Sequence, residues 1–78
     1  MNLYWNYRII FDPISNSYSI HEVYYENNKP RSWTENGICP FGESLDELSK
    51  DFEMMKEAFS EPILQIKRDQ NKEYLEEK

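Results

Sequence analysis

The segment GESLDELSKDFEMMKEAF, residues 42–59, decides the fold class because it specifies one amphipathic helix. Ser44 is a strong N-cap, and Glu47 follows three residues later, at the spacing of a capping box. Proline disfavours helical backbone in the residue before it, so Pro62 ends the helix. Large apolar side chains recur at steps of three or four and form one stripe, the predicted stripe: Leu45, Leu48, Phe52, Met55 and Phe59.

Three segments before the helix have the alternation and the composition of β-strands. Aromatic and β-branched residues dominate them, and turn-forming Asp, Pro, Asn and Ser separate them. We expect these strands at residues 3–11, 18–25 and 31–35, and residues 62–66 leave room for a short fourth strand. One face of the first strand is the more apolar: Leu3, Trp5, Tyr7, Ile9 and Phe11. The predicted stripe is expected to pack across this aromatic face.

Together these elements predict a single α+β domain. Its sheet has three or four mainly antiparallel strands, and one amphipathic helix covers one face, in the order β-β-β-α-β. The domain is expected to span residues 1–66. Residues 67–78, KRDQNKEYLEEK, are almost wholly charged, so we expect a charged tail or a frayed helix there.

The chain is acidic, with 15 Asp and Glu against 9 Lys and Arg and a formal net charge of −6. This charge repels phosphate backbones, so direct nucleic-acid binding is disfavoured and a basic protein partner is favoured. The single Cys39 cannot form an internal disulfide, and no apolar run approaches the about 18 residues that indicate a membrane span. We therefore expect no membrane association and a cytoplasmic location.

The helix start, Gly42-Glu43-Ser44-Leu45-Asp46-Glu47-Leu48, resembles that of the HicB-like antitoxins. The order of the segments and the hairpin residues 18–25 and 33–36 also resemble this family, and the resemblance spans about residues 5–66. It implies a degenerate ribonuclease H-like fold without catalytic acids. It further implies an antitoxin that covers a small basic HicA-like toxin, which cleaves RNA. The chain resembles the stand-alone N-terminal type of domain and has no recognisable DNA-binding domain.

The candidate partner-binding residues lie on the polar helix face and among the surplus aromatics: Asp46, Glu47, Asp51, Glu53, Glu57, Tyr24 and Trp33. The acids are either a solvated face with ion pairs such as Asp46–Lys50 or a docking face for a basic protein. The aromatics either fill the core or contribute to an interface. A homodimer is expected, and a stand-alone homo-oligomeric adaptor with no toxin is the alternative function.

Catalysis is not expected, because the sequence contains no nucleophile, base and orienting group at a recognisable spacing. His21 is the only histidine, and we interpret it as a structural or an exposed residue of a strand. Cys39 is interpreted as a half-buried loop thiol. Asp12 and Glu22 leave open a weaker alternative, a degenerate nuclease that retains metal binding. We expect no enzyme activity, no cofactor and no metal.

Overall fold

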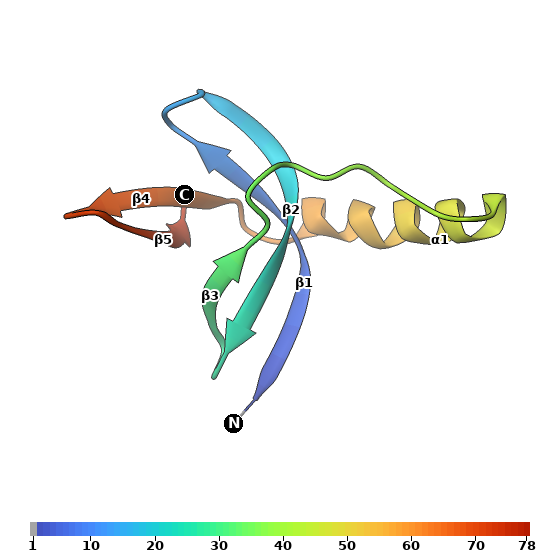
Figure 1. Ribbon diagram of the computed structural model, residues 1–78, viewed down its shortest axis with the longest axis horizontal. Helices are drawn as coiled ribbons and strands as arrows, with labels where there is room; N and C mark the ends of the chain where they lie inside the picture. Colours follow the sequence, from blue (N-terminus) through green and yellow to red (C-terminus); the bar gives the residue numbers. More distant parts are fainter. Residues whose placement is uncertain (1) are drawn as a thin grey trace.

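The computed structural model describes residues 2–78 and has an α+β fold, with one mixed five-stranded sheet and one helix (Figure 1). The sheet order is β3-β2-β1-β4-β5, in which β1 and β4 are parallel and every other neighbouring pair is antiparallel. The elements are β1 Leu3–Asp12, β2 Ser17–Glu26, β3 Lys29–Trp33, α1 Leu45–Lys56, the 3-10 turn η1 Glu57–Ser60, β4 Leu64–Asp69 and β5 Lys72–Glu77.

The α+β class is confirmed, but the sheet differs from the predicted three or four mainly antiparallel strands. It has a fifth strand, so the order β-β-β-α-β is incomplete, and the crossover through α1 makes one strand pair parallel. Residues 67–78 contain the end of β4 and all of β5 rather than a tail or a frayed helix. Their charges lie on the exposed positions of an outer hairpin, while Leu75 is buried in the core.

Two-residue turns close the β2–β3 and β4–β5 hairpins. Asn27 and Asn28 have φ angles of 53° and 68°, and Gln70 and Asn71 have φ angles of 50° and 70°. Two successive residues with positive φ match the right-handed twist of the flanking strands. Asparagine tolerates this left-handed backbone better than most residues do, which explains three of the four positions.

The main core lies inside the curled sheet rather than under the helix. The two edge strands β3 and β5 contact each other, which makes the sheet nearly barrel-shaped. The enclosed cluster is Ile10, Val23, Tyr25, Leu64, Ile66 and Leu75, with Trp33 packed against it. On β1 and β2 these residues belong to the face opposite Trp5 and Tyr7, because Ile10, Val23 and Tyr25 pair across the strands with Ser19, Asn6 and Tyr4. The sheet therefore buries its own core on the face that the sequence made look more polar.

The segment after the helix is tied to β1 by a buried arginine. Arg8 is 8% exposed, and its Nη2 donates to the carbonyl of Pro62 at 2.6 Å. Its Nη1 donates to the Tyr25 hydroxyl at 2.9 Å, inside the curled sheet. These bonds fix the place where the chain leaves η1 and turns into β4.

Candidate functional site

The start of α1 is built as the sequence predicted. The Oγ of Ser44 accepts a hydrogen bond from the backbone N of Glu47 at 3.1 Å, and Glu47 Oε1 accepts one from the backbone N of Glu43 at 3.1 Å. Gly42 lies so close to the first turn that an added Cβ would be 2.3 Å from the Leu48 nitrogen. Only glycine fits this position, and it lets residues 40–42 run against the helix.

The predicted stripe does not pack across the sheet, and this expectation is wrong. Figure 1 shows α1 extending away from the sheet, on the side opposite the β4–β5 hairpin. Met55 and Ala58, near the end of the helical segment, are buried at 2% and 0% exposure. The other four members of the stripe stay in solvent, with exposures of 38–82%: Leu45, Leu48, Phe52 and Phe59.

A different side of the helix faces the sheet, and Asp51 lies on it. The Tyr7 hydroxyl donates to Asp51 Oδ1 at 2.6 Å, and the backbone N of Phe41 donates to Asp51 Oδ2 at 2.9 Å. One carboxylate therefore joins β1, α1 and the loop that precedes the helix. The helix is rotated about its axis relative to the sequence expectation, which placed Asp51 on the exposed face.

The ionisation of this pair follows from its hydrogen bond. Donation from Tyr7 and from the Phe41 nitrogen lowers the pKa of Asp51 below its ordinary value of 3.8. Partial burial and the nearby Asp51 carboxylate raise the pKa of Tyr7 well above its ordinary value of 10.0. The charged carboxylate and the neutral phenol are thus the favoured forms over a wide pH range.

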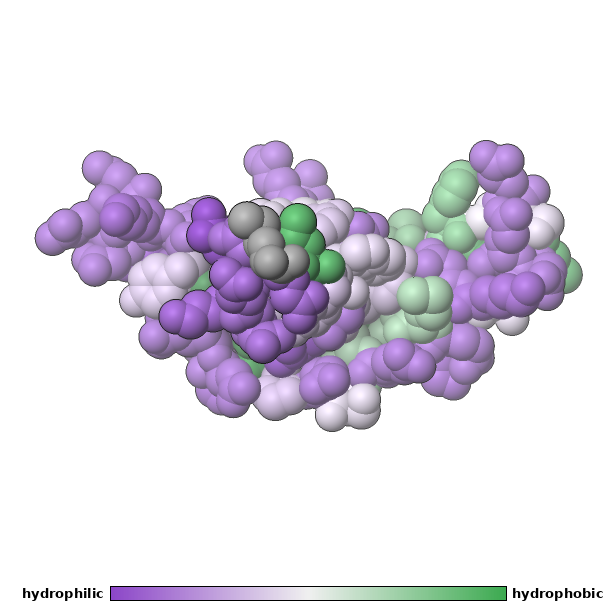
Figure 2. Space-filling view, turned by 90° about the horizontal axis from the view of Figure 1, so that it is seen from below, coloured by the Kyte–Doolittle hydropathy of each residue, from purple (hydrophilic) through white to green (hydrophobic). Residues whose placement is uncertain are grey.

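Exposed apolar side chains follow α1 from the loop before it to η1 after it, and we call this set the apolar edge: Phe41, Leu45, Leu48, Phe52 and Phe59. Pro40, Leu45, Leu48, Ser49 and Phe52 line a shallow cavity of about 300 Å³ at its N-terminal half. In the view of Figure 2, some green apolar atoms show among purple hydrophilic ones at the right-hand end, where Figure 1 places the start of α1. Large apolar side chains that stay exposed near one another are typical of interaction surfaces.

Charged residues run along another side of the helix, turned away from the apolar edge. Asp46, Lys50, Glu53 and Glu57 recur at steps of four, three and four, so they share one row. The predicted Asp46–Lys50 ion pair is confirmed at 3.0 Å, and Lys56 pairs with Glu53 at 3.6 Å. These pairs are exposed and stabilise the helix only slightly. The row keeps a net negative charge.

The seven predicted binding residues do not form one site. Asp46, Glu47 and Glu53 are exposed on α1 and Glu57 is exposed at the start of η1, whereas Asp51 is hydrogen-bonded to Tyr7. Tyr24 is 38% exposed on β2, and its hydroxyl donates to Glu22. Trp33 belongs to the interior of the curled sheet. The apolar edge was not predicted from the sequence. The spacing of the apolar residues indicated a buried face of the helix but did not show which element would cover it.

The residues considered for chemistry have structural contacts. Both ring nitrogens of His21 are occupied, by Ser19 Oγ at 2.7 Å and by the Thr34 carbonyl at 2.8 Å, and the residue is 5% exposed. Asp12 is bound by Arg68 at 3.2 Å, and its hydrogen bonds from the Ile14 nitrogen and from Arg68 lower its pKa. The expected half-buried thiol of Cys39 is exposed instead.

Within residues 2–78, no group of three or more His, Cys, Asp or Glu side chains has the geometry to hold a metal ion. No helix in the same range is long and apolar enough to cross a membrane. Comparison of the chain with protein-family models, with curated proteins and with solved structures returns no match.

Proposed function

We propose that this chain is a non-catalytic protein-binding module that docks through the apolar edge of α1 onto a basic partner protein. The observation that carries this proposal is the exposure of Leu45, Leu48, Phe52 and Phe59 on a helical segment whose N-terminal part extends beyond the sheet. An amphipathic helix that presents anchors at such spacing is the usual ligand of a hydrophobic groove. Phenylalanine and leucine side chains supply the apolar area, and the fixed helix lowers the entropy cost of binding.

The charge of the helix defines the partner. Asp46, Glu53 and Glu57 leave the polar side of the helix net negative even after the two lysine pairs are counted. A partner with an apolar groove bordered by Lys or Arg is complementary to this arrangement. Such a partner also gains in association rate from the net charge of −6. The proposal therefore commits to a basic protein rather than to a neutral or acidic one.

The narrower form of the proposal is an antitoxin-like role, in which the partner is a HicA-like RNA-cleaving toxin that is covered and blocked. Its support is the strand-strand-strand-helix-strand order over residues 3–69 and the helix start Gly42–Leu48. The packing of the predicted stripe on the sheet gives no support, because that packing is absent. This form adds the partner's identity to the docking surface and depends on it.

The test compares the affinity for the partner of the wild-type chain and of a double variant that is expected to keep its fold. Leu48→Asp with Phe52→Asp removes the centre of the apolar edge, and both side chains are exposed, so thermal stability should stay within a few degrees of wild type. A partner is captured from native cells with the wild-type chain, identified by mass spectrometry and then purified. Calorimetry with this purified partner should show at least about a hundred-fold weaker binding for the double variant.

A matched control adds the same two negative charges to the exposed β4–β5 hairpin, on the opposite side of the sheet from the helix: Tyr74→Asp with Asn71→Asp should bind as wild type does. The partner should be basic, and its affinity should fall as salt is raised. Equal binding by both double variants, or an acidic partner, would overturn the proposal. Sedimentation that shows a dimer lost only in Leu48→Asp with Phe52→Asp would assign the apolar edge to a second copy of this chain instead.

A further inference from the structure

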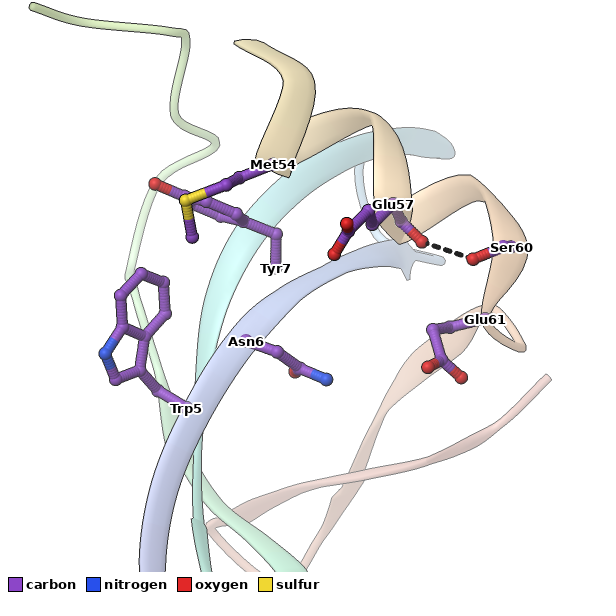
Figure 3. Close-up of a pocket in the computed structure, with 7 residues that line it drawn as sticks. All are labelled: Trp5, Asn6, Tyr7, Met54, Glu57, Ser60 and Glu61. Carbon is purple, nitrogen blue, oxygen red and sulfur yellow. Dashed lines mark hydrogen bonds between the residues drawn. The ribbon is translucent and has the colours of Figure 1, made fainter. Parts of the chain in front are cut away.

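A second feature, distinct from the apolar edge, is a cavity of about 460 Å³ where the end of the helical segment meets β1 (Figure 3). Trp5, Asn6 and Tyr7 line it from β1, and Met54, Glu57 and Glu61 line it from the helical side. The carboxylates of Glu57 and Glu61 and the side chain of Trp5 surround the opening in Figure 3. Sequence analysis gave no sign of this cavity, because its two walls are about 50 residues apart in the chain.

The topology explains why the cavity is there. β4 pairs with β1 only at Ile10 and Phe11, so the first half of β1 has no strand on that side. Ala58 is fully buried and holds η1 against the sheet next to this free edge. The Arg8 bond to the Pro62 carbonyl then fixes the chain that carries Glu61. Both walls are therefore held by buried contacts.

Several acceptor groups that line the cavity have no donor or cation bound to them within the described residues. Within residues 2–78, neither Glu57 nor Glu61 takes part in a salt bridge. The Tyr7 hydroxyl is committed to Asp51, and the Ser60 hydroxyl donates to the Glu57 carbonyl at 2.7 Å. Asn6 Oδ1 is closed to solvent and has no hydrogen-bond partner. A buried carbonyl oxygen without a donor costs free energy, and a bound donor that reached it would remove that cost.

The other walls suit an aliphatic chain that ends in a positive charge. The ring of Trp5 is held by an edge contact with Tyr7, at 5.2 Å between centroids and 86° between planes. Trp5 is 44% exposed, so one part of the indole remains open to a ligand. Tryptophan is the aromatic side chain that attracts cations best, and Met54 adds a flexible apolar wall. The nearest buried cation, Arg8, donates to Tyr25 and Pro62 and is not part of the lining.

We propose that this cavity binds an alkylammonium or guanidinium group, the end of a lysine or arginine side chain. The aliphatic stem lies along Trp5 and Met54, and the cation meets the carboxylates of Glu57 and Glu61. The site takes a basic side chain of a protein, and it stands whether or not the apolar edge binds the partner proposed above. A free amine of the same chemistry is the other source, and the test separates the two.

The test is a titration of the intact protein followed by NMR at the two indole N–H groups. The probes are Nα-acetyl-lysine methylamide, Nα-acetylarginine methylamide and butylamine, with Nα-acetylnorleucine methylamide as the neutral control. Trp5→Phe assigns the two signals, and Trp33 is an internal reference because it packs against the core on another strand. The cationic probes should shift the Trp5 signal with saturation and leave Trp33 unchanged. The neutral probe should not shift Trp5.

Glu57→Gln with Glu61→Gln should weaken binding of the capped lysine about ten-fold, since two partly exposed ion pairs are lost. Glu76→Gln with Glu77→Gln makes the same change in net charge on β5 and should bind as wild type does. If only the capped amino acids shift the Trp5 signal, the ligand is a side chain of a protein. If butylamine shifts the signal equally, the cation and its aliphatic stem are sufficient for binding. A Trp5 shift by the neutral probe, equal shifts of both indoles, or full binding by Glu57→Gln with Glu61→Gln would overturn the proposal.

Discussion

The Tyr7 hydroxyl on β1 and the Asp51 carboxylate on α1 are joined by a 2.6 Å hydrogen bond. This bond fixes the rotation of the helix about its axis. Asp51 is one residue before Phe52, so a helix that turns Asp51 toward the sheet carries Phe52 away from it. The outward direction of the apolar edge thus follows from this polar contact together with the burial of Met55.

Replacement of Tyr7 by Phe should lower stability in a pH-dependent way. In the folded chain the pKa of Asp51 is lowered, so the contribution of the bond is present above pH 3.8 and is lost as pH falls through the folded pKa. The pKa of Tyr7 is raised, so the contribution is present below pH 10.0 and is lost as pH rises through the folded pKa. The difference in unfolding free energy between wild type and Tyr7→Phe should be flat between about pH 4 and 10 and shrink outside this window.

Urea unfolding over this pH range provides the measurement. Other titrating groups, such as Asp12, are present in both proteins and cancel in the difference. A difference that does not change with pH would show that the phenol ring, and not its hydroxyl, makes the contribution.

Met55→Ala should destabilise the protein by about 2–5 kcal/mol, because this side chain is 2% exposed and its loss leaves a cavity between α1 and the sheet. Leu48→Ala should change stability by less than about 1 kcal/mol, since Leu48 is 38% exposed on the apolar edge. Denaturant unfolding of the two variants gives both values. Similar large losses would mean that Leu48 is packed against the sheet after all.

Leu75→Ala should destabilise the protein by about 2–5 kcal/mol, because Leu75 belongs to the core inside the curled sheet. Tyr74→Ala, at the neighbouring position, should cost less than about 1 kcal/mol, since that side chain is 42% exposed. Thermal unfolding distinguishes them. A neutral result for Leu75→Ala would show that residues 72–77 contribute nothing to the sheet.

Gln70→Asn should stabilise the protein by about 0.5–1 kcal/mol. Gln70 has a φ of 50° in the β4–β5 turn, where a long side chain is strained and asparagine is tolerated. The matched variant Gln65→Asn lies within β4, where the backbone is extended, and it should be slightly destabilising. Chemical denaturation of both proteins tests whether the gain belongs to the turn.

Local signals in the sequence predicted much of the fold. The N-cap at Ser44, the end of the helical segment before Pro62 and the strands at residues 3–11 and 18–25 are all found in the structure within one or two residues. These features depend on contacts between near neighbours, such as the Ser44–Glu47 hydrogen bond. Local chemistry is sufficient to specify them.

Features that depend on distant contacts could not be predicted in the same way. The period of the predicted stripe shows that an apolar side exists, but a 44-residue separation hides the Tyr7–Asp51 bond that turns it outward. β5 was missed because alternation between solvent and core leaves only Leu75 as a strong apolar signal in it. Gln70-Asn71 was the one available sign of a hairpin turn there. The candidate cavity also depends on distant contacts, because residues 5–7 form one wall and residues 54–61 form the other.

The parallel pairing of β1 with β4 has a consequence for the order of folding. The β1–β2–β3 hairpins pair residues that are close in sequence, and they are expected to form early. The pairing of β1 with β4 joins Ile10 to Leu64, 54 positions later, and is expected to form afterwards. During that delay the apolar interior of the half-built barrel faces water, and the free side of the central strand is open to pairing with another chain. The arrival of β4 and β5 is therefore the step that separates correct folding from aggregation.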